Sequence, residues 1–301
     1  MRCEVVTERP VDLASTLSPL RRGRFDPCHR VESDGTVWRA SLLPSGPVTY
    51  RLRQQGPSRV DVQVWGPGAD VFDAFLPGLL GAHDDAAGFT PTHPKLVEAH
   101  RRFPDLRVVR TGRVFEALVP AILEQRVHTV AARASWGRLV TAFGTPAPGP
   151  APEGMRVPPG PEVWRRVPSW EFHRANVDPR RARTIVECAR VADRLEAVVD
   201  LGSSDAQQRL QSVPGVGAWT AAEVAQRALG DADALSVGDF HLAATVGWTL
   251  LGRPLDDADM VEYLADLRPH RYRAVRLLEV SGQARKPKFG PRTPIVDHRW
   301  H

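Results

Sequence analysis

The repeat of apolar residues changes partway along the chain, from a strand-like period to a helix-like one. Three runs, at 37–42, 48–52 and 60–64, alternate apolar and polar residues and are separated by proline and glycine turns. This pattern is typical of an antiparallel meander with one face in water, and 71–80 could form a helix over the other face. From Pro94 onward the apolar spacing is that of helices. The sequence therefore predicts an α+β fold, with a β-rich N-terminal domain followed by an all-helical one.

The expected domains are a β-rich one at 1–92 and a helical one at 93–284. A connection at 144–161 contains seven prolines and interrupts the helices, because proline cannot hold a helix interior. The last segment, 285–301, is basic and rich in proline and glycine, and we expect a loosely ordered tail. Helical patterns cover 115–122, 127–143, 162–172, 179–195, 203–211, 219–229, 239–251, 256–266 and 270–281.

The charge balance favours an acidic partner. The 301 residues carry a formal net charge of +5, and lysine occurs only at Lys95, Lys286 and Lys288, so that 37 of the 40 basic residues are arginines. A basic chain of this kind suggests nucleic acid as a ligand. A mechanism that needs a lysine nucleophile could use only these three residues. Arginine cannot replace them, because its guanidinium stays protonated.

Other compositional features exclude several classes of protein. Cys3, Cys28 and Cys188 lie far apart, which excludes a four-cysteine zinc or iron–sulfur site and argues against a disulfide scaffold. The first 25 residues are charged and lack the apolar segment of a signal peptide. No apolar run approaches the ~20 residues of a membrane span. We therefore expect a soluble, monomeric, cytoplasmic protein without a membrane segment.

Two glycines separate the helices expected on either side of 210–222, where the sequence reads LQSVPGVGAWTAA. Pro214 ends the first helix, and Gly215 and Gly217 permit a tight turn and the close approach of a partner. The second helix would begin with free N–H groups that suit a phosphate. A plain corner between two helices is the alternative. About twenty residues on, Asp239 precedes an apolar helix pattern within 235–245, where a simple N-cap is the alternative to a functional role.

Together these segments resemble the helix-hairpin-helix DNA glycosylase superfamily, most closely its alkylpurine branch, DNA-3-methyladenine glycosylase II. The run at 115–125 resembles the first core helix of that branch, and 104–107 resembles the loop before it. The resemblance covers most of residues 95–282. It implies a monofunctional glycosylase of base excision repair that flips alkylated purines out of damaged double-stranded DNA and hydrolyses their N-glycosidic bond.

The resemblance also implies roles for single residues of the site. Asp239 falls on the catalytic aspartate, whose carboxylate would stabilise the oxocarbenium-like sugar formed as the bond breaks. Trp219 and Phe240 fall on aromatic positions of the base pocket, where a ring face attracts a cationic base. Core packing is the alternative for Trp219. His128 and His241 are expected to be local helix or packing residues.

Four positions depart from the pattern of the alkylpurine enzymes. Glu223 and Glu279 stand where those enzymes commonly carry further pocket aromatics, so both are expected to contact the base. The alternative for Glu223 is a solvated residue or an arginine partner. Arg126 replaces the apolar wedge and would fill the gap left by the flipped base, or contact a phosphate only. Glu124 replaces a usual glycine, and nothing in the sequence explains it.

The hairpin carries two more expectations. Catalysis needs no cofactor, but the backbone carbonyls of Gln211, Val213 and Val216 would hold a structural Na⁺ or K⁺. Strand-cleaving members carry a lysine two residues after the second glycine, where this chain has Trp219, so no lyase activity is expected. The resemblance implies that the DNA is contacted by Gln125, Arg126, Val213, Gly215, Val216, Gly217 and Thr220.

Two other functions stay open. A protein that recognises damaged DNA without catalysis would keep the hairpin and would not need Asp239. A glycosylase for a different modified base would account for the two glutamates in the pocket.

Overall fold

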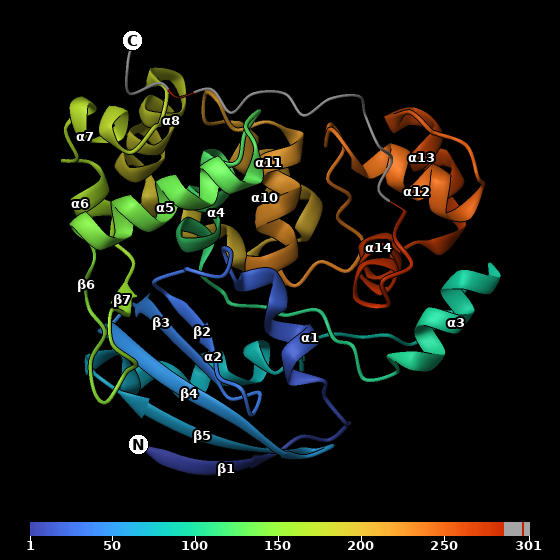
Figure 1. Cartoon of the computed structure of the whole chain (residues 1–301), viewed down its shortest axis with the longest axis horizontal. Coiled ribbons are helices and arrows are strands. Elements are labelled where there is room, and N and C mark those ends of the chain that lie inside the picture. Colours follow the sequence, from blue (N-terminus) through green and yellow to red (C-terminus); the bar gives the residue numbers. More distant parts are fainter. Residues whose placement is uncertain (286–296, 298–301) are drawn as a thin grey trace.

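A five-stranded sheet forms one side of the molecule in the computed structural model, and helices cover the rest (Figure 1). The structure describes residues 1–285 and Asp297. The strand order is β1–β5–β4–β3–β2, and every neighbouring pair is antiparallel, which confirms the predicted fold class. The strands are β1 Arg2–Val6, β2 His29–Val31, β3 Val37–Leu43, β4 Gly46–Gly56 and β5 Arg59–Trp65.

Short helices cover one face of this sheet. Val60, Val62 and Val64 of β5 are fully buried and alternate with more exposed residues, as the two-residue period of a strand requires. They belong to one apolar cluster with Phe72 and Leu76 of α2, the helix expected over this face. The helices of this region are α1 Leu13–Leu17, η1 Ser18–Leu20, η2 Pro67–Val71 and α2 Phe72–Leu79.

The opposite face was expected to be wet, and at β3 that expectation is wrong. Trp38 and Ala40 of β3 pack against Met155 and Val157, which come from the proline-rich connection. That connection forms a short antiparallel pair, β6 Thr145–Pro146 and β7 Arg156–Val157. The sheet is therefore buried on both faces at β3, because an irregular segment distant in the sequence closes over it.

The remaining helices form two clusters. The first is centred on the almost wholly buried α4, and the second joins α3 to the C-terminal helices (Figure 1). The first contains α4 Val114–Leu123, α5 Thr129–Phe143, α6 Pro161–Trp164, α7 Ser169–Arg174, α8 Pro179–Arg190, α9 Ala192–Glu196, η3 Ala197–Asp200, α10 Ser203–Gln211, α11 Ala218–Val224 and the π-helical η4 Ala225–Leu229. The second contains α3 Pro94–Arg102, α12 Leu242–Leu250, α13 Asp257–Tyr263, η5 Ala265–Leu267 and α14 Arg271–Val280.

The start of α4 is fixed by a residue 82 positions away. The Glu196 carboxylate accepts the N–H groups of Val114 and Phe115, each at 3.0 Å. Burial raises the pKa of this carboxyl, partly offset by the guanidinium of Arg113. A helix end capped from such a distance gives no local signal in the sequence.

The predicted basic tail lies, apart from Arg285 and Asp297, outside the described residues. Within residues 1–285, none of the helices combines the length and the apolar character that crossing a membrane requires.

Candidate active site and DNA interface

The turn between α10 and α11 is a tight glycine hairpin. Gly215 has a φ of +92°, and a Cβ there would lie 2.2 Å from Oγ1 of Thr184 on α8. Gly217 is extended, and nothing lies within 4 Å of the place its Cβ would take. The fold therefore requires the first glycine, whereas the space beside the second is open to an approaching molecule. No side chain caps the start of α11, so its first N–H groups stay available there.

Gln125 ties this hairpin to the end of α4. Its Nε2 donates to the carbonyl of Gly215 at 2.9 Å and to Oγ1 of Thr220 at 2.8 Å. Arg126 follows directly and is exposed, with a φ of +52° that is uncommon for a residue other than glycine. The structure thus brings together four of the residues expected to contact DNA.

The hairpin backbone also contains the carbonyls expected to hold a cation. The carbonyl of Val213 accepts the N–H of Val216 at 3.0 Å, which leaves one of its lone pairs for another partner. Among residues 1–285 there is no group of three or more His, Cys, Asp or Glu side chains placed to hold a metal ion. A cation on the carbonyls of Gln211, Val213 and Val216 stays a prediction.

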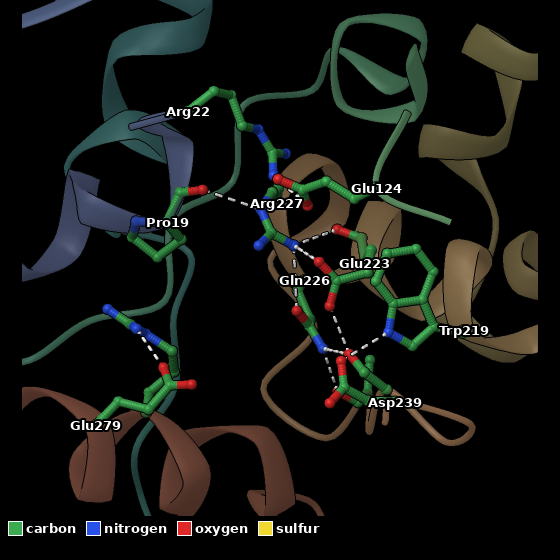
Figure 2. A network of polar contacts seen from close by, with 12 residues as sticks. Pro19, Arg22, Glu124, Trp219, Glu223, Gln226, Arg227, Asp239 and Glu279 are labelled. Carbon is green, nitrogen blue, oxygen red and sulfur yellow. Dashed lines mark hydrogen bonds and ion pairs between the residues drawn. The ribbon is translucent and has the colours of Figure 1, made fainter. Parts of the chain in front are cut away.

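Asp239 lies in the loop before α12, which starts at Leu242 and not at 239 as expected. Its Oδ1 accepts the N–H groups of His241 at 2.8 Å and of Leu242 at 2.9 Å. Its Oδ2 accepts the indole N–H of Trp219 at 3.3 Å (Figure 2). One oxygen therefore anchors the carboxylate at the helix start, and the other points toward the half-buried tryptophan.

Glu223 lies on the same side of α11 as Trp219 (Figure 2). Its Oε2 is 2.9 Å from Nη1 of Arg227, and its Oε1 accepts the hydroxyl of Ser236 at 2.6 Å. Burial lowers the pKa of Arg227, but the acidic groups around it, Glu223 first among them, raise it above its ordinary value. Because the carbonyl of Ser236 in turn accepts the N–H of Asp239 at 3.1 Å, Glu223 also supports the loop that carries Asp239.

A second ion pair lies beside the first. Nη1 of Arg22 is 3.3 Å from Oε2 of Glu124, which gives this glutamate, unexplained from the sequence, a partner in the structure. Burial and the neighbouring Arg227 lower the pKa of Arg22. Glu279 lies across from this pair on α14, half exposed, and is paired with Arg276 at 2.5 Å (Figure 2).

Phe240 is not placed with these residues. Its side chain is 79% exposed, and its ring meets the ring of His241 edge-on at 4.8 Å. The structure therefore presents Phe240 on the surface of the loop, next to Asp239 but facing solvent. His128 is also exposed and precedes the first turn of α5.

Comparison with known proteins places this geometry in a familiar architecture. No protein-family model matches the chain. The probable bifunctional transcriptional activator/DNA repair enzyme AlkA of Mycobacterium tuberculosis is 35% identical over 196 residues, 61% of this chain. The chain spans only 38% of the length of this relative. The 3-methyladenine DNA glycosylase of Archaeoglobus fulgidus superposes with a TM-score of 0.76 at 20% identity, over 93% of this chain and 98% of its own.

An enzyme with a different substrate in its name has the same architecture. The 8-oxoguanine glycosylase/lyase of Clostridium acetobutylicum, solved with double-stranded DNA, has a TM-score of 0.69 at 12% identity, over 94% of this chain and 98% of its own. The chain has the helix-hairpin-helix DNA glycosylase fold. The resemblance in fold that the two motifs predicted is thus confirmed, and a 3-methyladenine DNA glycosylase is among the similar structures.

Within this glycosylase fold, the sequence analysis did not identify the two arginines, Arg22 and Arg227, that pair with the glutamates of the site. Arg227 follows Glu223 by four residues, a spacing at which opposite charges pair on a helix, so a signal for it existed. Arg22 lies 102 positions before its partner Glu124, and among 37 arginines nothing marked it.

Proposed function

We propose that this chain is a DNA glycosylase that removes alkylated purines of the 3-methyladenine type from double-stranded DNA without cutting the strand. The observation that carries the proposal is the fixed carboxylate of Asp239, held through Oδ1 by two backbone N–H groups, with Oδ2 toward Trp219. The names of the matched relatives, a DNA repair enzyme and a 3-methyladenine DNA glycosylase, support this class of reaction.

The DNA would be held where the hairpin and α4 meet. Open space beside Gly217 and uncapped N–H groups of α11 suit a phosphate, and Gln125 keeps the hairpin in place from the neighbouring helix. Arg126 would enter the gap that the flipped nucleotide leaves, since its guanidinium plane can stack on bases. The flipped base would lie against the ring of Trp219, whose face attracts a cationic alkylpurine.

The chemistry then needs little more than one carboxylate. As the bond between C1′ and the base nitrogen breaks, positive charge develops on the sugar. Oδ2 of Asp239 stabilises that charge and orients the water that completes the hydrolysis. An alkylated purine is already positively charged, so it leaves as a neutral base without protonation by a general acid.

Strand cleavage is not part of the proposed reaction, because the hairpin lacks the amine that it requires. Trp219 occupies the position of the family's lysine, and Lys95 lies on α3 with its Nζ donating to the carbonyl of Thr249 at 2.6 Å. A covalent complex trapped by borohydride on damaged DNA would overturn this part of the proposal.

A glycosylase for another modified base is the second candidate. The observation that favours it is the ion pair of Glu223 with Arg227 on the helical segment that carries Trp219. Glu223 stands where the alkylpurine enzymes commonly have an aromatic residue. Fixed donors and acceptors of this kind suit a base that is selected by hydrogen bonds and not by stacking alone.

Wild type and Asp239→Asn should be compared on duplexes that each contain one lesion, with alkali used to cleave at the abasic product. We expect wild type to excise alkylated purines and the variant to be slower by about 100-fold or more, because the amide cannot stabilise the developing charge. Product on another lesion alone would favour the second candidate, and no product on any lesion would favour a non-catalytic damage-binding protein. Undiminished activity in the variant would disprove the role of Asp239.

A further inference from the structure

Two sets of arginines near the surface of this chain differ in their ion pairing. Four exposed arginines on the outer helices are each paired with a glutamate three positions before them, in the pairs Arg101–Glu98, Arg165–Glu162, Arg174–Glu171 and Arg190–Glu187. In contrast, the half-buried Arg21 and the exposed Arg24, Arg126 and Arg133 make no ion pair with any carboxylate of the described residues, which is also true of some arginines elsewhere, such as Arg138. A cluster of uncompensated arginines is the electrostatic footprint expected of a surface that binds phosphates.

Three of these arginines line one open hollow. It is formed by Arg21, Arg24 and Arg133, with Ser18 and Gly23. Gly23, with a φ of +91°, lies so close to α5 that a Cβ there would approach Cδ of Arg133 to 2.9 Å. The N-terminal region and the helical region thus contribute charge to the same surface.

The loop that carries Arg24 and Phe25 is firmly anchored. Oδ2 of Asp26 accepts the N–H of Arg22 at 2.7 Å, and its Oδ1 accepts the indole N–H of Trp136 on α5 at 3.1 Å. This anchored loop holds Phe25 86% exposed, with the guanidinium of Arg24 lying 5.5 Å from the centre of its ring. An exposed aromatic side chain among arginines that have no ion pair suits both the apolar and the charged parts of a nucleic acid.

This surface is connected to the proposed active site through the end of α4. The ion pair of Arg22 with Glu124 joins the loop to the end of α4, and Gln125 joins the same end to the hairpin. Arg126 directly follows Gln125 and is exposed. A duplex seated on the hairpin, with its gap at Arg126, would therefore reach the loop at 21–25.

We propose that Arg21, Arg24, Phe25 and Arg133 form a second DNA-binding surface, through which the β-rich N-terminal region holds duplex beyond the flipped nucleotide. The three arginines contact phosphates, and Phe25 packs against the adjoining sugar or base. The proposal rests on the proposed function only in taking DNA as the ligand.

The test measures binding alone, by fluorescence anisotropy on a duplex with a tetrahydrofuran abasic analogue at several salt concentrations. In Arg21→Ala/Arg24→Ala/Arg133→Ala we expect the slope of log K against log salt to shrink by about 0.9 for each phosphate that the protein no longer neutralises. The control Arg101→Ala/Arg165→Ala/Arg190→Ala removes the same charge from glutamate-paired positions and should keep the wild-type slope. Phe25→Ala should weaken binding about 5-fold or more with an unchanged slope.

The outcomes separate this proposal from the proposed function. Equal slopes in the two triple variants, or a wild type that does not bind the duplex, would overturn the second surface. A wild type that binds but excises no base would disprove the glycosylase and leave the difference in slopes as evidence for the surface. Thermal melting of each variant checks that the fold is kept.

Discussion

Glu223 is bound on both of its carboxylate oxygens, to Arg227 on one side and to Ser236 on the other. An arginine partner was the alternative considered for this residue, and the structure contains that pair. A base entering beside Trp219 would meet this pair as a unit, with the carboxylate as acceptor and the guanidinium as donor. Its effect on selectivity should therefore come from fixed hydrogen-bonding geometry and not from a free negative charge.

The variant Glu223→Gln tests this view, since the amide can still accept from Ser236 but loses the ion pair. We expect relative excision rates across a lesion panel to shift by about 10-fold, because hydrogen-bonded sites discriminate strongly between bases. Affinity for an abasic duplex should stay near that of wild type. The control Glu187→Gln removes an exposed partner of Arg190 on α8 and should change neither quantity. Equal losses on every lesion would contradict selection by Glu223.

The acidic residues of the site could be predicted from the sequence, whereas most of the residues that pair with them could not. Asp239, Trp219 and Glu223 follow from the motif and from the four-residue helix spacing, and the structure brings them together. Arg22 and Ser236 reach the site through loops whose course the sequence does not specify. For Phe240 the motif gave the position but not the orientation of the side chain, because the conformation of an irregular loop does not follow from a motif. The structure exposes this ring to solvent.

The hairpin contains two glycines that should respond differently to substitution by alanine. Gly215→Ala would force a Cβ onto Thr184 in a positive-φ conformation, which costs about 1–2 kcal/mol from the backbone alone. Gly217→Ala meets nothing in the protein, so the free energy of unfolding should not fall. We expect Gly217→Ala to weaken DNA binding instead, because its methyl group occupies the space proposed for a phosphate. Urea denaturation and anisotropy measure the two effects. Unchanged DNA affinity in Gly217→Ala would contradict the phosphate position.

The short strand β2 contains a buried histidine that should make stability depend on pH. Burial lowers the pKa of His29 well below its usual value, helped by Arg39 and Arg21. The unfolded chain binds a proton near pH 6.5 and the folded chain does not, so stability should fall as pH drops below about 6.5, by up to about 1.4 kcal/mol per unit. His29→Gln should reduce this slope in urea denaturation, whereas the exposed-site control His128→Gln should keep it. An equal slope in all three proteins would contradict the assignment.

Periodicity decided which elements could be predicted. The long strands β3 to β5 and most helices repeat an apolar pattern over enough residues to be detected. The strands β2, β6 and β7 have two or three residues, too few for a period, and they form because neighbouring backbone offers partners. Burial of the second face of β3 by Met155 and Val157 has the same origin.

For the whole molecule, one buried ion pair joins the segment after α2 to the C-terminal helices. Asp84 and Arg273 of α14 are each 2% exposed, with their nearest atoms 2.5 Å apart. Oδ2 of Asp84 also accepts the N–H of Val108 at 3.0 Å, and Arg273 donates to the carbonyl of Asp85 at 3.2 Å. This pair therefore fixes the second helical cluster, which includes the helix that begins beside Asp239, against the rest of the chain.

Asp84→Ala should cost about 3–5 kcal/mol of unfolding free energy, because it leaves the guanidinium of Arg273 buried without its partner. The control Glu98→Ala breaks the exposed pair with Arg101 and should cost no more than about 1 kcal/mol. The double variant Asp84→Ala/Arg273→Leu removes both charges and should be more stable than Asp84→Ala, since the penalty comes from the isolated charge. Urea denaturation gives all three values. A smaller loss in Asp84→Ala than in the surface control would contradict the role of this ion pair in holding the two parts of the molecule together.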